Sequence, residues 1–404
     1  MSACADPAGH PAPGADDATG AAMLMPPPLS LYVHLPWCVR KCPYCDFNSH
    51  AAKGELPFDA YVDALVRDLE HDLPLVWGRP VHSVFFGGGT PSLFPPAAID
   101  RFLQAASARL RIAPDAEITL EANPGTAEHG RFDGYRAAGV NRVSFGIQSF
   151  DDGCLQRLGR IHDSSEAEAA VKLAQDAGLD NLNLDLMYAL PGQDLAMAEA
   201  DLARAFALQP AHISHYQLTL EPNTVFFARP PQGIPDDDLA WDIQERCQAL
   251  LAQAGYAHYE TSAYARPGRQ CAHNLNYWRY GDYLGIGAGA HAKITLGAEQ
   301  AILRRWKQRH PAAWMEAAGS AAAIGGDERI EPARRPFEFM LNALRLHEGF
   351  ALADFEARTG LARHALEPAL AEAARRQWLV AEAGRVRPTA LGRRFANDVI
   401  TLFL

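Results

Sequence analysis

The sequence predicts an α/β protein with a partial parallel (β/α)6 barrel and a C-terminal, mainly helical, winged-helix-like lobe. Six short apolar or β-branched runs alternate with longer amphipathic runs, as in a series of βα units. The residues whose side chains could bind a ligand or a metal follow these short runs, as expected at the C-terminal edge of a parallel sheet. The composition shifts near residue 325, where a second set of helical runs begins.

The first strand of the barrel is expected at residues 31–35, and the other five at residues 81–86, 117–121, 142–147, 182–190 and 212–220. Between them, apolar residues recur every three or four positions at residues 58–73, 167–177 and 195–208, which predicts helices. Strands separated by helices favour right-handed crossovers and a parallel sheet.

Composition limits the classes of function. The 404 residues carry 37 basic and 48 acidic side chains, and no dense basic stripe, which argues against a nucleic-acid partner. No apolar run reaches membrane-spanning length, and the first basic residue is Arg40, so neither a transmembrane segment nor a targeting segment is expected. Residues 1–28 read as a disordered leader. Seven cysteines without a disulfide pattern suit the reducing cytoplasm.

Three cysteines stand close together, at Cys38, Cys42 and Cys45. A cubane iron-sulfur cluster held by three thiolates leaves one iron open, and an open iron binds and activates a ligand. Two alternatives remain: a zinc site completed by His34 or a distant ligand, or a redox pair that leaves Cys38 idle. A c-type haem site is excluded because Asp46, not histidine, follows Cys45.

Further candidate binding residues lie at or after the ends of the other predicted strands. They are the glycine run at 87–91 and the polar residues Glu121, Gln148, Asp185 and Gln217. Glycine lets backbone approach a ligand closely, although an ordinary tight turn has the same composition. An acidic residue after a strand either caps a helix or binds ribose hydroxyls. Their shared position with the cysteine loop favours a binding site.

The Cys-x3-Cys-x2-Cys motif with Tyr44 before its last cysteine, and the Gly87-Gly88-Gly89-Thr90-Pro91 run, resemble the radical S-adenosylmethionine (SAM) superfamily. The resemblance implies a [4Fe-4S] cluster on the three cysteines, with SAM chelating the fourth iron. In that superfamily, electron transfer splits SAM into methionine and a 5'-deoxyadenosyl radical.

From residue 30 onward the chain resembles the branch with oxygen-independent coproporphyrinogen III dehydrogenase (HemN) and the HemW-type haem chaperones. The resemblance assigns Tyr32, Gly88 and Glu121, with the three cysteines, to the cluster-bound SAM, and it places Tyr44 of the motif among the cofactor-binding residues. It matches to a second SAM of the dehydrogenase the residues Gly89, Thr90, Gln148, Arg160, Asp185 and, more loosely, Gln217. Alternatively, Arg160 pairs with Asp163 at the surface and Asp185 is a satisfied buried carboxylate.

Two differences separate the branches. The dehydrogenase motif has another cysteine two residues after the third, where this chain has Phe47. The dehydrogenase also has a substantial N-terminal segment, for which the short leader here offers little replacement. Both differences favour the chaperone branch.

A second motif, His273-Asn274-x-x-Tyr277-Trp278, resembles the H-N-x-x-Y-W sequence associated with haem binding in HemW-like proteins. If this stretch is helical, His273 and Tyr277 share one face. By themselves these residues fit packing and hydrogen bonding, whereas the resemblance implies haem, with His273 as the iron ligand. His291, at the end of the glycine-rich segment 281–291 that follows the motif, is a further candidate for an iron ligand.

The predicted domains are the leader at 1–28, the barrel at 29–235, a barrel-closing extension at 236–325 and the lobe at 326–404. Within the lobe we expect helices at 352–359, 366–378 and 391–404, and a hairpin formed by 379–381 and 385–387.

The leading hypothesis is a haem chaperone that binds haem, the cluster and SAM and delivers haem to acceptor haemoproteins, with respiratory ones among the candidates. The alternatives are a coproporphyrinogen III dehydrogenase and a metal-stabilised scaffold. The sequence leaves open whether the protein is an enzyme, which residue is catalytic, whether a second SAM binds and whether the chain forms a homodimer.

Overall fold

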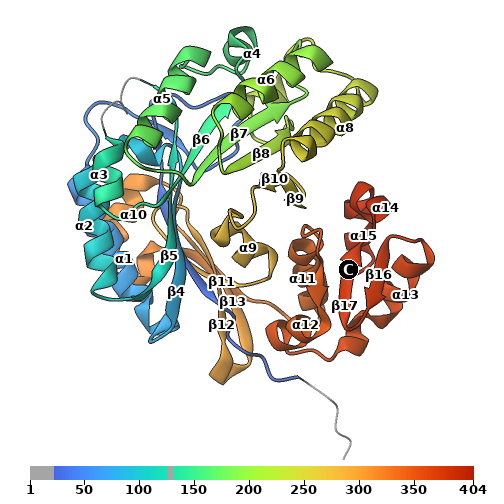
Figure 1. The fold of residues 1–404 in the computed structure, drawn as a ribbon. Coiled ribbons are helices and arrows are strands. Elements are labelled where there is room, and N and C mark those ends of the chain that lie inside the picture. The colour runs from blue at the N-terminus through green and yellow to red at the C-terminus, as the bar shows by residue number, and fades with distance from the viewer. Residues whose placement is uncertain (1–21, 126–130) are drawn as a thin grey trace, which may run out of the picture.

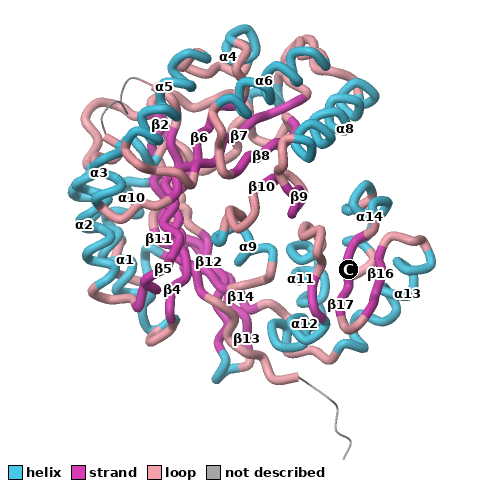
Figure 2. Tube along the Cα trace, in the orientation of Figure 1, coloured by secondary structure: helices cyan, strands magenta, loops and turns pink. Residues whose placement is uncertain are grey.

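A single large sheet forms the centre of the molecule. The structure, a computed structural model, describes residues 22–125 and 131–404. In these residues twelve strands follow the order β14-β13-β12-β11-β1-β4-β5-β6-β7-β8-β10-β9, and those from β11 to β8 run parallel (Figure 2). The parallel strands are β1 (Leu29–Leu35), β4 (Pro80–Gly88), β5 (Arg111–Ala122), β6 (Arg142–Gln148), β7 (Leu182–Tyr188), β8 (His212–Gln217) and β11 (Asp282–Ile286).

All six predicted strands are confirmed, and the fold is the expected α/β architecture. Two of them end earlier than predicted. β7 stops at Tyr188 because Ala189 has φ 55°, a left-handed conformation that leaves the strand. β8 stops at Gln217.

Antiparallel strands extend both edges of the parallel sheet. Beyond β11 lie β12 (His291–Leu296), β13 (Ala301–Lys307) and β14 (Ile324–Arg329), and beyond β8 lie β10 (Ala263–Ala265) and β9 (Ala257–Glu260). A separate pair is formed by β2 (Trp37–Cys38) and β3 (His50–Ala51). The segment predicted to close the barrel thus contributes β11, which continues the sheet from β1.

Helices cover the outer face of the sheet, whereas α9 lies within its curve (Figure 1). The helices of this part are α1 (Phe58–Asp72), α2 (Pro96–Ser107), α3 (Phe132–Ala137), α4 (Asp152–Arg157), α5 (Ser164–Asp176), α6 (Leu195–Ala207), α7 (Val225–Ala228), α8 (Asp237–Gln253), α9 (Ala272–Trp278) and α10 (Pro311–Ala317). No helix of the described residues is long and apolar enough to cross a membrane.

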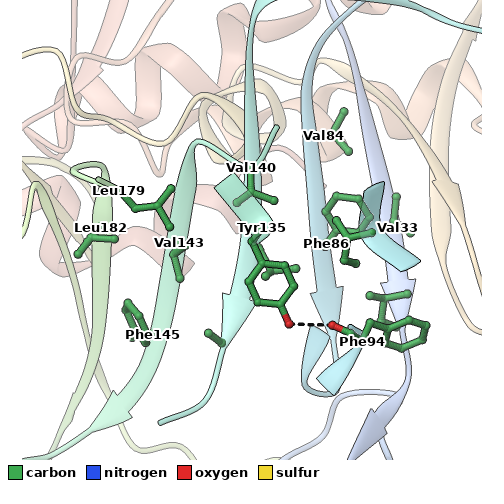
Figure 3. Close-up of a cluster of buried hydrophobic side chains, with 14 of the residues drawn as sticks. Val33, Val84, Phe86, Phe94, Tyr135, Val140, Val143, Phe145, Leu179 and Leu182 are labelled. Atoms are coloured by element: carbon green, nitrogen blue, oxygen red, sulfur yellow. Dashed lines mark hydrogen bonds between the residues drawn. The ribbon is translucent and has the colours of Figure 1, made fainter. Parts of the chain in front are cut away.

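The core lies between the sheet and the outer helices. Strand residues such as Val84, Phe86 and Phe145 are fully buried there (Figure 3). Each such side chain stabilises the fold by roughly 1.5–3 kcal/mol. Tyr135 satisfies its buried hydroxyl by donating to the carbonyl oxygen of Phe94 at 2.7 Å. This packing fixes the strand ends that form the candidate site.

The C-terminal lobe is winged-helix-like, as predicted. Its elements are α11 (Arg335–Ala343), β15 (Phe350–Ala351), α12 (Leu352–Thr359), α13 (Glu367–Arg375), β16 (Leu379–Glu382), β17 (Arg385–Pro388), α14 (Ala390–Arg394) and α15 (Ala396–Thr401). The predicted helix at 391–404 is divided at Phe395, whose ψ of 34° leaves the helical range.

The lobe shares its core with the rest of the molecule. Leu24, Tyr280 and Ile302 are buried in the same apolar cluster as the lobe residues. The Leu24 amide also donates to Oε1 of Gln300 at 2.8 Å. Residues 1–21 of the predicted leader lie outside the described residues, whereas Leu24, near the end of that leader, packs in a core.

Two buried ion clusters hold the extension on the barrel. Asp282 on β11 contacts Nζ of Lys293 at 2.9 Å and Nη1 of Arg79 at 2.8 Å. Lys307 on β13 contacts Asp68 of α1 at 2.5 Å. Because removing one partner leaves a buried charge unpaired, these contacts fix where β11 to β13 lie.

Candidate cofactor site

A cavity of about 310 Å³ lies at the C-terminal ends of the parallel strands, and we call it the cysteine cavity. It brings together the residues that followed the predicted strands. Its lining includes Cys38, Cys42, Tyr44, Cys45, Phe47, Gly88, Gly89, Thr90, Glu121, Asn123, Ser144, Gln148, Arg160, Asp185, Met187, Tyr216 and Gln217.

The cysteine loop is tied to the glycine run. The amide of Gly89 donates to the carbonyl oxygen of Leu35 at 2.8 Å, and the amide of Thr90 donates to that of Trp37 at 2.7 Å. A Cβ at Gly89 would lie 2.5 Å from the Trp37 carbonyl oxygen, so this approach requires glycine. The run is therefore more than an ordinary turn: it positions the first cysteine.

A guanidinium faces the thiols. Cys38 is buried and Cys42 and Cys45 are half-buried. Arg160 Nη1 lies 3.6 Å from Sγ of Cys42, and its Nη2 donates to the Gly146 carbonyl oxygen at 2.6 Å. Burial raises the pKa of the Cys38 thiol, so a nearby cation or metal is needed to hold thiolates here.

The alternative pairing of Arg160 with Asp163 is wrong. The side chain of Asp163 caps α5 by accepting the Glu166 amide at 2.9 Å, and Arg160 points into the cavity instead.

Glu121 on β5 and Asp185 on β7 both face the cavity, and neither has a cationic partner within ion-pair distance among the described residues. Glu121 accepts the Gly88 amide at 3.2 Å, and burial together with the charge of Asp185 raises the pKa of Glu121 to about 8. Asp185 accepts from Oγ of Ser144 at 3.1 Å and from Nδ2 of Asn183 at 2.8 Å. The hydrogen bonds of Asp185 fit the satisfied-carboxylate interpretation, yet both groups remain on the cavity wall.

The end of β6 is strained. Gln148 has φ 73°, and the pairing of β6 with β7 shifts register between Gly146 and Gln148. Strain of this kind gathers at functional sites and turns a side chain toward its ligand. Oε1 of Gln148 accepts from the Tyr216 hydroxyl at 2.9 Å. Gln217 lies exposed at the rim.

A second cavity of about 790 Å³ adjoins the first, and we call it the extension cavity. Residues Asp46, Phe47, Gly88 and Glu121 line both cavities. The other lining residues are Tyr32, His34, Asn48, Tyr277, Tyr283, Gly289, His291, Trp306 and Arg309. Tyr32 therefore lines the extension cavity, and in this structure it does not line the cysteine cavity.

The predicted helix of the second motif is α9. Glu117 on β5 caps it by accepting the amides of Ala272 and His273, both at 3.1 Å. The rings of His273 and Tyr277 lie 5.0 Å apart, which confirms their shared face. Tyr277 reaches the extension cavity.

His273 points into the protein interior. It is only 2% exposed, its Nδ1 pairs with Oγ of Ser83 at 3.0 Å, and its ring stacks on Phe85 at 4.9 Å. Burial and the nearby Arg142 charge lower its pKa to about 3. His273 lines neither cavity. Asn274 is half-buried, and the Arg345 guanidinium covers the ring of Trp278 at 4.2 Å.

Comparison with known proteins agrees with this geometry. Residues 32–205 match the radical SAM superfamily, and residues 330–395 match the HemN C-terminal domain. The heme chaperone HemW of Escherichia coli K12 is 52% identical over 95% of this chain and 100% of that protein. The chain belongs to the HemW family of radical SAM proteins.

Other relatives place the HemW family near HemN. The heme chaperone HemW of Haemophilus influenzae is 49% identical over 94% of this chain and 98% of its own length. The structure of coproporphyrinogen III oxidase (HemN) from E. coli superposes with a TM-score of 0.79 at 26% identity, covering 94% of this chain and 90% of that one.

The donor set fits the cluster of this superfamily. Among the described residues, no three His, Cys, Asp or Glu side chains converge as ligands of one metal ion. In a cubane each thiolate binds a different iron, so three thiols spread around one cavity are suitable donors. Arg160 supplies positive charge beside these thiols.

Sequence reasoning assigned no cofactor-binding role to Asn123, Ser144 or Tyr216. Asn123 Nδ2 donates to Oγ1 of Thr90 at 2.8 Å, and Asn123 Oδ1 accepts from Arg160 at 2.7 Å. The position of Asn123 two residues after Glu121, beyond the end of β5, was the available signal.

Proposed function

We propose that this protein is a cytoplasmic haem chaperone that binds haem, a [4Fe-4S] cluster and SAM and transfers haem to acceptor haemoproteins. The observation that best supports this proposal is the sequence similarity, over nearly the whole chain, to the E. coli protein named heme chaperone HemW. The reduced thiols of the cysteine cavity support the cytoplasmic location.

The cysteine cavity supports the cofactor part of the proposal. Cys38, Cys42 and Cys45 would hold three irons of the cluster, and Arg160 would offset the negative charge of its thiolates. When bound, such a cluster supplies one electron to SAM.

The ligand roles of the other wall residues follow from their hydrogen-bonding groups. The carboxyl groups of Glu121 and Asp185 offer acceptors for ribose hydroxyl or amino groups of SAM. Gln148, held by Tyr216, presents its amide at a fixed angle.

A second candidate function is oxidation of coproporphyrinogen III. The likeness to HemN over nearly the whole chain favours it. Phe47 opposes it, because this residue stands where the dehydrogenase motif has a cysteine and is 60% exposed between the two cavities.

Anaerobic reconstitution followed by haem transfer tests the proposal. We expect about four iron and four sulfide per chain, binding of haem, and its transfer to apo-haemoproteins, respiratory ones included. Cys38→Ser should lose the cluster, whereas Cys247→Ala, a buried cysteine outside both cavities, should retain it. Turnover of coproporphyrinogen III to protoporphyrinogen IX would overturn the chaperone proposal.

A further inference from the structure

The extension cavity is large and open enough for a flat macrocycle. Its volume of about 790 Å³ lies within the range of roughly 300–1,000 Å³ that is usual for cofactor sites. It is formed by residues of the barrel, of α9 and of β11 to β13. Tyr32, Gly88 and Glu121, which the resemblance assigns to the cluster-bound SAM, lie on its barrel side. The opposite wall contains residues that this assignment does not use: Tyr277, Tyr283, His291, Trp306 and Arg309.

Two histidines line this cavity, and only one has free ring nitrogens. His34 is engaged on both sides: Nδ1 pairs with the Tyr32 hydroxyl at 3.0 Å, and Nε2 pairs with the Asn48 carbonyl oxygen at 2.9 Å. In the part of the chain that the structure describes, the imidazole of His291 has no hydrogen-bond partner. It is exposed at the start of β12. Free imidazole nitrogen is a common axial ligand of haem iron.

The walls beside His291 are aromatic. Trp306 is its cross-strand neighbour on β13, and the two rings stack at 6.4 Å. Tyr277 and Tyr283 lie on the same cavity with ring centroids 4.3 Å apart. Flat apolar rings offer a macrocycle large surfaces to pack against.

A free cation lies at the same cavity. Arg309 is exposed just after β13, and within the described ranges its guanidinium has no carboxylate partner. Its main-chain carbonyl oxygen accepts Nδ2 of Asn48 at 2.9 Å, which anchors the residue. Guanidinium groups bind carboxylates such as haem propionates in a bidentate manner.

We propose, as a refinement that rests on the haem chaperone function above, that haem binds in the extension cavity with His291 as axial ligand and Arg309 on a propionate. The motif residue that touches the macrocycle is Tyr277. His273 has a free nitrogen too, because only its Nδ1 is bonded, to Ser83, and its buried Nε2 has no partner among the described residues. It is nevertheless a positioning residue, because its ring stacks on Phe85 and it does not line the cavity. The haem then lies beside Phe47 and Glu121, which line both cavities.

The test is a haem titration of the cluster-loaded full-length protein, followed by the Soret band and by electron paramagnetic resonance. His291→Ala should weaken binding about tenfold or more and remove the low-spin imidazole signature. Added imidazole should restore that signature. His310→Ala, an exposed neighbour that does not line the cavity, is the matched control and should bind as the wild type does. Arg309→Ala should weaken binding of haem but not of haem dimethyl ester.

The variant His273→Ala distinguishes His291 as the iron ligand from His273, the ligand that the motif implies. If the wild type binds haem, His291→Ala binds it unchanged and His273→Ala loses the signature, the refinement is overturned and the chaperone proposal stands. Unchanged binding by both variants also overturns the refinement. If both variants lose haem binding, imidazole is added to each. Restored binding in His291→Ala but not in His273→Ala supports the refinement, and any other result overturns it. A wild type that binds no haem overturns the chaperone proposal itself.

Discussion

Glu121→Gln should make the protein more stable, and increasingly so as the pH rises. The folded-state pKa of Glu121 is about 8, against an ordinary value of 4.5, because burial and the Asp185 charge disfavour its ionised form. Between these values the folded protein holds a proton that the unfolded chain has released. The free energy of unfolding of the wild type therefore falls as the pH rises through this window, while glutamine does not ionise.

The magnitude follows from the size of the shift. At about 1.4 kcal/mol per pH unit, the stability difference between variant and wild type should grow by about 3 kcal/mol from pH 5 to pH 8. The glutamine side chain keeps an oxygen that can accept the Gly88 amide, so this hydrogen bond need not be lost.

Urea unfolding of the cluster-free protein at pH 5, 6.5 and 8 measures this difference. The control is Glu245→Gln, the same substitution at an exposed position on α8. A Glu121→Gln effect that is constant across the pH range, or that shrinks as the pH rises, would refute the reasoning.

Three further changes test the fold around the site. Leu24→Ala should lower the free energy of unfolding by roughly 2–5 kcal/mol and speed proteolysis of the C-terminal lobe, because Leu24 is buried in the core of that lobe; unchanged proteolysis would contradict the shared core. Asp282→Asn should cost about 3–5 kcal/mol in thermal or urea unfolding, since it leaves Lys293 buried without its carboxylate. Gly89→Ala should lose most cluster iron and sulfide after reconstitution, because its Cβ would meet the Trp37 carbonyl oxygen; full cluster content would show that the loop adapts.

Six of the seven parallel strands could be predicted from sequence because their buried stretches read as apolar or β-branched runs, whereas β11 was not predicted. The flanking strands could not. The second half of β13 carries three charged residues, Arg304, Arg305 and Lys307, whose partners on α11 and α1 are distant in sequence. When distant residues neutralise the charges of a strand, the local sequence shows no apolar run that would predict that strand.

The candidate site divides in the same way. The cysteine cavity could be predicted because parallel strands bring their C-terminal ends together, which places Glu121, Gln148 and Asp185 beside the cysteines. The direction of His273 could not, because Ser83 and Phe85 on β4 determine which way its helix turns it. The contact between His291 and Trp306 could not be predicted either, because it depends on the register of β12 against β13.

The position of β1 in the sheet also has a consequence for biosynthesis. β1 lies between β4 and β11, so Leu29 pairs with Val81 on one side and with Asp282, about 250 residues later, on the other. At about 5–20 residues per second, a ribosome needs roughly 10–50 s to deliver that second partner. During this interval the nascent chain carries its thiol-bearing loop beside an unpaired strand edge, and the extension cavity, whose lining includes Tyr283, His291 and Trp306, can form only after most of the polypeptide has been translated.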